Sequence, residues 1–413
     1  MTWRESTLGD YIRIEHGFAF KGEYFSDAGK YVLLTPGNFY EQGGFRSRPG
    51  KDRFYTGQFP EKYLLSKGDL IVAMTEQGEG LLGSAALIPE SSVYLHNQRL
   101  GLVKVKQAVA DRRFLYYLFN SGSVRDQIRN TSSGTKVRHT SPERIYSVKV
   151  RMPTKLAQQK ISVILSTYDD LIANNQHRIT LLEGMAEEIY REWFVRMRFP
   201  GYSSCTFIKG RPDSWAEGRL EDIATFTMGQ SPSSEFYNSN GDGLPFHQGV
   251  GTYGSRYPKH EVFCSQPGRK AEPGDILFSV RAPVGRLNIA DADMIIGRGL
   301  AALRHKQGKN TYLFYLLQAS FANEDMIGNG SIFNSVGKDE LASFPIYKPD
   351  IRLVERFEKI VKPMDEEIHL LYSMIKRLQD CRDSLLPRLI SGKLKVAHLD
   401  IQFPPSMRED AAA

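Results

Sequence analysis

The chain of 413 residues contains one pattern twice, and this duplication limits the folds that it can adopt. Similar strings recur about half the chain length apart, and their separation shrinks in small steps, as loop deletions between two copies would cause. The matched strings are residues 8–12 with 220–224, 67–71 with 273–277, Arg99 with Arg298, 114–118 with 312–316, and 134–135 with 330–331. The sequence therefore predicts one module built twice.

The first part of each copy has short apolar runs separated by turn residues, which is typical of short strands. Residues 69–73 and 100–105 in copy one, and 275–280 in copy two, are runs of this kind. Residues 114–119 and 312–319 repeat their apolar positions every three or four residues, so we expect helices packed on each sheet.

The second part of each copy carries apolar residues in alternating steps of four and three, which is the pattern of a coiled coil. The seam positions of the first helix include Ile172, Asn175, Ile179, Leu182 and Ile189, and those of the second include Ile368, Leu371, Ile375, Leu378 and Leu385. Only a return of the second helix along the first buries both seams, so we expect an antiparallel pair. The polar seam residues Asn175 and Arg382 would fix its register.

Each helical stretch also contains a second start signal. Residues 166–169 resemble a capping box, and Pro363 precedes three acidic residues at 365–367. We therefore expect a break near residues 166 and 362, followed by a long helix of about thirty residues, or roughly 45 Å.

The predicted fold class is α+β, with two β-rich domains separated by two long helices that form an antiparallel coiled coil with an internal pseudo-two-fold repeat. The expected boundaries are residues 1–152 and 198–348 for the β-rich domains, 153–197 and 349–395 for the spacer helices, and 396–413 for a C-terminal tail.

The composition favours a cytoplasmic protein with a polyanionic partner. Lys and Arg number 54 against 47 Asp and Glu, which gives a net charge of +7 and a pI near 9.1. That surplus is consistent with nucleic acid. The sequence has no apolar run long enough for a membrane helix and no apolar signal core near its first residue, and its three cysteines form no metal or disulfide pattern.

The usual catalytic motifs are missing, so we expect no catalytic, cofactor-binding or metal-binding residues in this chain. Residues 249–254 spell G-x-G-x-x-G, but Pro258 follows and no helix can begin there. His260, Glu261 and Cys264 lack a second ligand pair. Residues 403–406 lack the Asn and the aromatic residue of an amino-methyltransferase loop.

Several strings resemble the specificity subunit of type I restriction–modification enzymes. The resemblance covers nearly the whole chain and rests on these strings: residues 74–77, 80–85 and 96–101 in copy one, residues 229–238, 243–249, 281–285 and 296–301 in copy two, and residues 385–394 at the end of the second helix.

That resemblance implies a non-catalytic subunit of a methyltransferase and endonuclease complex. Each β-rich domain would be a target recognition domain that reads one half of a bipartite asymmetric site in double-stranded DNA, with the helices as a ruler for the spacer. Two modification subunits would bind S-adenosylmethionine and methylate adenine. Restriction subunits would use ATP and Mg²⁺, so this chain itself would carry no cofactor.

Polar residues in glycine-rich loops are the candidates for contact with DNA, because such loops reach base edges and phosphates. We predict Lys21, Thr75, Glu76, Gln77, Asn97, Gln98, Arg99, Lys136, Arg138 and His139 in copy one, and Gln230, Ser231, Ser233, Ser234, Gln248, Tyr253, Arg281, Arg298 and Asn329 in copy two. The alternative for Arg99 and Arg298, which the repeat pairs, is a buried ion pair that holds each module together.

Two other functions remain open at this point. One is the specificity chain of a related bipartite system whose nuclease and methylase are fused in one partner. The other is a coiled-coil scaffold whose β-rich domains bind protein or glycan.

Overall fold

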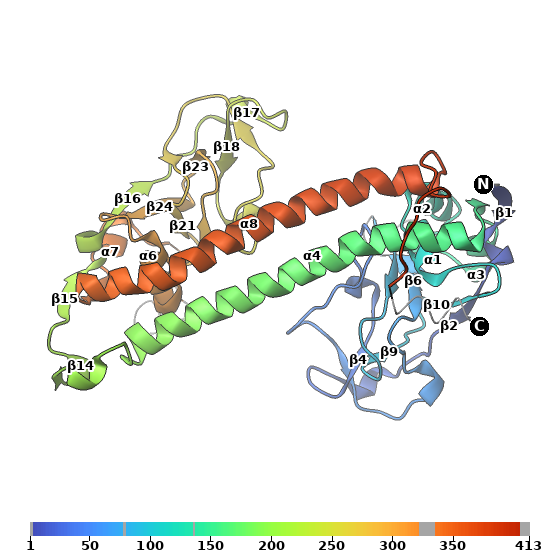
Figure 1. The fold of residues 1–413 in the computed structure, drawn as a ribbon, viewed down its shortest axis with the longest axis horizontal. Helices are drawn as coiled ribbons and strands as arrows, with labels where there is room; N and C mark the ends of the chain where they lie inside the picture. The colour runs from blue at the N-terminus through green and yellow to red at the C-terminus, as the bar shows by residue number, and fades with distance from the viewer. Residues whose placement is uncertain (1–2, 77–79, 135–136, 322–334, 405–413) are drawn as a thin grey trace. The chain divides into compact units, whose positions relative to one another are not determined.

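A computed structural model describes residues 3–76, 80–134, 137–321 and 335–404, and the chain divides into two compact units. Unit 1 comprises residues 1–174 and 374–413, and unit 2 comprises residues 175–373. Each unit holds a β-rich region and a piece of both long helices (Figure 1). We call these β-rich region 1 (residues 3–152) and β-rich region 2 (residues 198–348).

In unit 1, a four-stranded antiparallel sheet in the order β2-β10-β6-β8 packs against the helices, and a second sheet has the order β3-β5-β4-β9. Strands β1 and β12 pair, as do β7 and β11. The strands are β1 Arg4–Thr7, β2 Ile12–His16, β3 Phe25–Ser26, β4 Tyr31–Leu33, β5 Phe54–Tyr55, β6 Leu70–Ala73, β7 Thr75–Glu76, β8 Ala85–Leu87, β9 Tyr94–Leu95, β10 Leu100–Val105, β11 Arg138–His139 and β12 Lys149–Met152. The helices are α1 Arg112–Phe119, α2 Gly122–Asn130 and α3 Pro142–Tyr146.

In unit 2, the corresponding four-stranded sheet has the order β16-β24-β21-β22, and the second sheet has the order β17-β19-β18-β23-β20. The strands are β13 Phe207–Ile208, β14 Arg211–Pro212, β15 Ala216–Arg219, β16 Ala224–Met228, β17 Tyr237–Asn238, β18 Leu244–His247, β19 Phe263–Cys264, β20 Lys270–Ala271, β21 Ile276–Ser279, β22 Leu287–Ile289, β23 Met294–Ile296, β24 Leu300–His305 and β25 Pro345–Lys348. The helices are α5 Leu220–Ile223, α6 Asn310–Phe321 and α7 Lys338–Ala342.

The two units share the order and the pairing of their four-stranded sheets, and the pair of strands that closes each β-rich region. Arg4 of β1 lies opposite Met152 of β12, and Ala216 of β15 lies opposite Lys348 of β25, at matching places in the two copies. The strands and helices expected from the apolar runs are present as β6, β10, β21, α1 and α6. The duplicated α+β fold is therefore confirmed.

The long helices are part of the core of each unit. In unit 1, Ile161 and Leu165 of α4 (Lys155–Tyr190) are fully buried in one cluster with Phe114 of α1 and Leu70 of β6. In unit 2, a second cluster joins residues of α4 and of α8 (Ile351–Ile390) to the sheet. Phe357 and Val361 of α8 are fully buried there. Because they share these clusters, sheet and helices bury apolar surface together.

The predicted breaks near residues 166 and 362 are wrong. Helix α4 is continuous over 36 residues and α8 over 40 residues, and Figure 1 shows both as unbroken ribbons. The Ser166 and Thr167 hydroxyls donate to the Val163 carbonyl inside the helix and cap nothing. Pro363 lies within α8, where it costs about 3 kcal/mol. Val361 and Ile368 in the neighbouring turns are fully buried, and this packing offsets that cost.

The two long helices approach each other inside each unit. In unit 1, Arg382 of α8 lies 2.7 Å from the Asp169 carboxylate of α4. In unit 2, Arg178 of α4 lies 2.6 Å from Glu367 of α8. Unit 1 thus holds the first part of α4 with the last part of α8, and unit 2 the reverse, as an antiparallel pair requires. The predicted seam residues are all buried or half-buried: Ile172, Asn175, Ile179, Leu182, Ile189, Ile368, Leu371, Ile375, Leu378 and Leu385.

Within the part of the chain that the structure describes, no helix is long and apolar enough to cross a membrane.

The two ion pairs between the helices should differ in strength. The Arg382–Asp169 pair has side chains 27% and 30% exposed, and Tyr117 also donates a 2.5 Å hydrogen bond to Asp169. The Arg178–Glu367 pair is 47% and 40% exposed, in the range where such pairs contribute about 0–1 kcal/mol. We expect Arg382→Ala to lower the free energy of unfolding by about 2 kcal/mol and Arg178→Ala by less than about 1 kcal/mol. Urea denaturation measures both, and equal losses would contradict this ranking.

Candidate DNA-binding surface

In β-rich region 1, the predicted residues Asn97, Gln98 and Arg99 line a polar hollow of about 510 Å³. They form the turn before β10, because the Leu100 amide donates to the Asn97 carbonyl and the Gln98 amide donates to the Phe18 carbonyl. A side chain at Gly17 would place its Cβ 2.2 Å from the Asn97 oxygen, so only glycine fits beside this turn. Lys21 is exposed and directly precedes Gly22, which also lines the hollow.

The same hollow is lined by three basic residues that our sequence analysis missed, namely Arg48, Lys51 and Arg53. The Asn38 side chain, which is almost fully buried, donates a 3.1 Å hydrogen bond to Asp52 and so fixes the loop that carries them. A signal for this loop exists in the sequence. Residues 46–53 hold four basic side chains around a Pro-Gly turn, which is how a phosphate-binding loop often looks.

Glu76 is a buried residue that stabilises a turn, so the structure does not support its predicted contact with DNA. Its side chain is buried, and one carboxylate oxygen accepts the Leu81 and Leu82 amides at 2.9 and 2.7 Å. Arg125, also buried, donates to the carbonyls of Glu41 and Gly80. Burial lowers the pKa of Arg125 to about 10. Glu76 therefore holds the 80–82 turn in place, and we leave it out of the interface.

A second group of predicted residues in region 1 comes together through a short strand pair. His139 lies opposite Thr75, and Arg138 lies opposite Glu76. The predicted residues Gln77 and Lys136 lie outside the described residues.

In β-rich region 2, the structure brings Gln230, Ser231, Gln248 and Arg298 together. The Ser231 hydroxyl donates a 2.7 Å hydrogen bond to the Gln248 side chain and accepts the Arg298 amide at 3.2 Å. The Gln230 amide donates to the Ile296 carbonyl. A Cβ at Gly297 would lie 2.6 Å from the Gln248 side-chain oxygen. Glycine at this position therefore lets the Gln248 loop approach β23, and the Gln248 and Arg298 side chains remain exposed.

The other predicted residues of region 2 are placed separately. Ser233, Ser234 and Arg281 are exposed, and Arg281 forms an isolated bridge with Ser335. The Tyr253 hydroxyl is buried, so its predicted contact with DNA does not fit this structure. Asn329 lies outside the described residues.

The structure also corrects the pairing of Arg99 with Arg298. The Met74 amide donates to the Arg99 carbonyl, and the Val280 amide donates to the Gly299 carbonyl at the matching place in unit 2. Arg99 therefore corresponds to Gly299, and Gln98 corresponds to Arg298. Both arginine side chains are exposed, so the alternative of a buried ion pair is wrong for both. The error arose because each copy has one arginine in the turn before an apolar strand. The two arginines occupy neighbouring positions of that turn, not the same one.

A series of polar side chains that contact one another lies next to the Gln248 loop and stabilises it. His247 is fully buried, its ring nitrogens lie 2.7 Å from the Thr252 hydroxyl and 3.1 Å from His260, and His260 lies 3.1 Å from Asp291. Burial lowers the pKa of His247 to about 4, so the ring is neutral at physiological pH. A neutral ring can donate at one nitrogen and accept at the other, which suits this arrangement.

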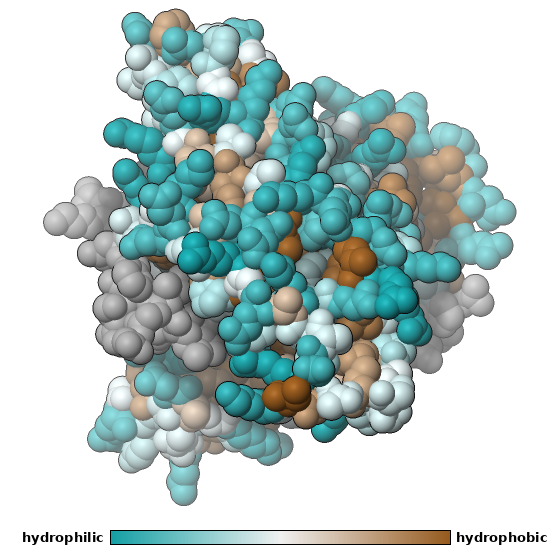
Figure 2. Space-filling view, turned by 90° about the vertical axis from the view of Figure 1, so that its left-hand side faces the viewer, coloured by the Kyte–Doolittle hydropathy of each residue, from teal (hydrophilic) through white to brown (hydrophobic). Residues whose placement is uncertain are grey.

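The surface that Figure 2 shows suits a polar partner. The face turned to the viewer in Figure 2 is mostly hydrophilic, with hydrophobic residues scattered between polar ones. In the described ranges, no group of three or more His, Cys, Asp or Glu side chains could hold a metal ion. Exposed Arg, Gln, Asn and Ser side chains on rigid turns are the groups that read base edges and phosphates.

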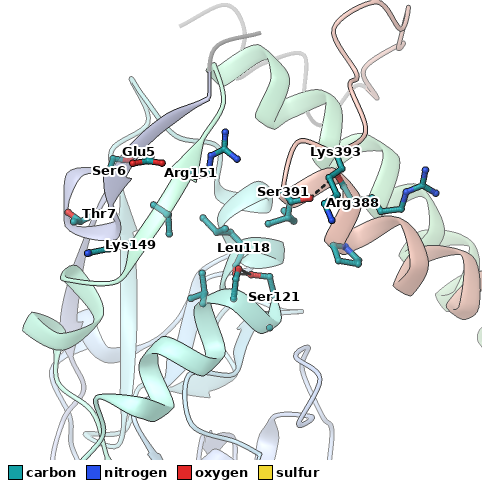
Figure 3. Close-up of a pocket in the computed structure, with 16 residues that line it drawn as sticks. Glu5, Ser6, Thr7, Leu118, Ser121, Lys149, Arg151, Arg388, Ser391 and Lys393 are labelled. Atoms are coloured by element: carbon teal, nitrogen blue, oxygen red, sulfur yellow. Dashed lines mark hydrogen bonds between the residues drawn. The ribbon is translucent and has the colours of Figure 1, made fainter.

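A larger hollow of about 1030 Å³ lies elsewhere in unit 1, where β1, β12 and the last turn of α8 meet. Figure 3 shows Lys149 and Arg151 on β12 and Arg388 and Lys393 on the opposite wall, with the Arg388 guanidinium directed away from the hollow. At the corresponding edge of unit 2, Arg211 stacks on Tyr347. This hollow carries no cluster of base-reading amides, so we do not include it in the candidate interface.

Two copies of one α+β module, each with a polar loop cluster on a rigid sheet and joined by two long helices, define a class of two-domain binding proteins. The family model described as type I restriction modification DNA specificity domain matches residues 1–184 and 212–371. The chain belongs to this family, and it is a specificity subunit of a type I restriction–modification system, the non-catalytic subunit.

Individual relatives agree with the family assignment. The chain is 28% identical over 349 residues to the putative type I restriction enzyme MjaX specificity subunit of Methanocaldococcus jannaschii. The alignment covers 81% of this chain and 80% of that protein. It is 21% identical over 471 residues to the HindI specificity subunit of Haemophilus influenzae, covering 95% and 99% of the two chains. The crystal structure of the S subunit from M. genitalium, 17% identical over 94% of this chain and 96% of that one, has the same fold with a TM-score of 0.61.

Buried neutral histidines should make the fold sensitive to acid. His96, His247 and His305 are nearly inaccessible, and burial lowers the pKa of each to about 4 from an ordinary 6.5. A folded-state pKa below the unfolded value gives stability that is present above pH 6.5 and is lost as the pH falls toward 4. The loss by pH 5 is up to about 2 kcal/mol per histidine. We expect the melting temperature to fall between pH 7 and pH 5.

The variant His247→Gln should show a smaller fall over the same pH range, since it removes one of these groups. The exposed His16 gives a matched control, and His16→Gln should behave as the unsubstituted chain does. Scanning calorimetry at several pH values measures this, and a melting temperature that does not change with pH would contradict it.

Proposed function

We propose that the two β-rich regions are target recognition domains, each of which reads one half of a bipartite asymmetric site in double-stranded DNA. The observation that supports this proposal is that corresponding turns of the two regions, which have the same backbone arrangement, carry different polar side chains. Before β10, the turn presents Asn97, Gln98 and Arg99, whereas before β24 it presents Arg298 beside Gln248. Two copies with the same frame and different reading groups suit two unlike half-sites.

The chemistry of these side chains fits the edges of base pairs. Asn and Gln amides can form paired hydrogen bonds with adenine, and Arg can do so with guanine. In region 1 we assign Arg48, Lys51 and Arg53 to phosphates, because they line the same hollow as Asn97 and Gln98. Thr75, Arg138, His139 and Lys21 would complete the contacts of region 1, and Ser233, Ser234 and Arg281 those of region 2.

We also propose the partners that such a subunit needs. Two modification subunits would dock on this chain, bind S-adenosylmethionine and methylate adenine at the site that the recognition domains select. Restriction subunits would join them and use ATP and Mg²⁺ to cut DNA, in the cytoplasm. The positive charge of +7 is modest because the partner subunits would share the grip on the DNA.

The alternative of a related bipartite system with a fused nuclease and methylase is not favoured, because the family model and the relatives are those of type I specificity subunits. The genes next to this one distinguish the two systems. The idea of a scaffold that binds protein or glycan is not favoured by the family assignment.

Methylome sequencing tests the proposed function. The chain is co-expressed with its modification subunit in a host that lacks adenine methylation of its own. We expect one bipartite motif with two fixed half-sites, an unspecified spacer and methylated adenine. The absence of any bipartite motif would contradict the proposal.

The variant Arg298→Ala tests the reading role of the turn before β24. If Arg298 reads a base, the variant should relax one position of one half-site and lose roughly 5- to 150-fold discrimination there, while the other half-site stays fixed. Arg219→Ala, an exposed arginine paired with Glu221 in the same unit, serves as the control and should leave the motif unchanged. Weaker methylation at all sites with an unchanged motif would make Arg298 a phosphate contact.

A further inference from the structure

The loop at residues 255–257 of β-rich region 2 reaches across to the long helices of unit 2. The Arg256 guanidinium forms an ion pair with Asp365 of α8 and lies 3.6 Å from Glu183 of α4. Its side chain is only 3% exposed, and it stacks over the Phe314 ring at 4.7 Å. One residue of this loop thus contacts both long helices and α6.

The neighbours of Arg256 make the same connection. The Ser255 hydroxyl lies 2.6 Å from the Tyr372 hydroxyl, and the Tyr257 ring packs edge-on against His369 and Tyr372 of α8, with centroids 5.2 Å apart in each case. The Arg256 carbonyl accepts the Ile289 amide of β22, which ties the loop to the sheet of region 2. We call Ser255, Arg256 and Tyr257, with Asp365 and Tyr372, the loop clamp.

A hollow lies beside the loop clamp. It has about 580 Å³. Region 2 lines it with residues 273, 274, 276, 289–291, 308, 310, 311 and 314, and α8 lines it with residues between 358 and 370. Region 2 and α8 are therefore not in continuous contact here. Beside this hollow the clamp adds polar contacts to the apolar core that region 2 shares with α8, so its loss should weaken the attachment of region 2 to α8.

Asp365 of the clamp accepts a tyrosine hydrogen bond that has a counterpart in unit 1, but the arginine that contacts the aspartate comes from a different element in each unit. The Tyr315 hydroxyl of α6 lies 3.0 Å from Asp365, as the Tyr117 hydroxyl of α1 lies 2.5 Å from Asp169. The arginine that meets Asp169 is Arg382 of α8, 2.7 Å away. In unit 1 the arginine thus joins α8 to α4, whereas in unit 2 it joins the 255–257 loop of region 2 to both long helices.

We propose that Arg256 is a positioning residue that fixes recognition domain 2 on helices α4 and α8, and that it thereby restricts the spacer length that the protein accepts between its half-sites. This inference depends on the proposed bipartite function. One extra base pair moves a half-site by roughly 3.4 Å and turns it by roughly 35° about the duplex axis. A recognition domain with a fixed orientation on the helices cannot follow this shift of its half-site, whereas a domain that can reorient binds at both spacer lengths.

The test removes the clamp without leaving a buried charge. Loss of one partner of a buried ion pair costs about 3–5 kcal/mol, whereas replacing both partners by neutral groups is often tolerated. The double variant Arg256→Met with Asp365→Asn therefore keeps the fold more safely than Arg256→Ala. Methylome sequencing with the modification subunit should show that methylation at sites with the spacer one base pair longer or shorter rises at least tenfold relative to the original spacer, with both half-site sequences unchanged.

Arg304→Ala is the matched control, because Arg304 is ion-paired with Asp275 and Glu272 inside region 2 and touches neither long helix through those pairs. It should keep the original spacer. The conservative variant Arg256→Lys keeps the charge and should retain most of the spacer preference. It is assayed in place of the double variant if that variant melts too early.

The outcomes separate the two proposals. Unchanged spacer preference in a folded double variant would overturn the positioning role, as would a relaxed half-site sequence at the original spacer or failure of Arg256→Lys to retain that preference. The absence of any bipartite motif with the unsubstituted chain would instead contradict the proposed function itself.

Discussion

Each β-rich region of this protein shares its apolar core with the long helices, and the rest of the structure depends on that sharing. Ile161 and Leu165 of α4 lie in the same buried cluster as Phe114 and Leu70 of region 1, and Phe357 of α8 lies in the cluster of region 2. A sheet of four short strands needs a packed face to be stable, and the helices provide it. Helix α8 is therefore continuous through Pro363, because the packing of Val361 before that residue and Ile368 after it outweighs its cost.

The shared core leaves the turns at the strand ends free to differ between the copies. The backbone of the turn before β10 and of the turn before β24 makes matching hydrogen bonds, held by Gly17 in one copy and Gly229 in the other. The side chains on these turns contribute little to the core, so they can change without loss of the fold. A backbone frame that both copies share, with different side chains on its turns, is a physical basis for two different DNA-reading surfaces in one chain.

The sequence was sufficient to predict the duplicated α+β fold, the strands and the antiparallel helices, because all of these follow from the periodicity of apolar residues. It was not sufficient for features that depend on tertiary contacts. The start signals at Ser166 and Pro363 were overridden by packing, and the burial of Glu76 and Tyr253 depends on residues distant in sequence. The register of Arg99 against Arg298 was one residue wrong, and only the strand hydrogen bonds could correct it. Arg48, Lys51 and Arg53 carried a readable signal that was overlooked.

The most direct test of the account is a cryo-electron microscopy structure of this chain with its modification subunits on DNA that contains the methylated motif. The account predicts that residues 97–99 of region 1 contact the base edges of one half-site, and that Gln248 and Arg298 of region 2 contact those of the other. A structure in which these turns face away from the DNA, or in which both regions contact the same half-site, would contradict it.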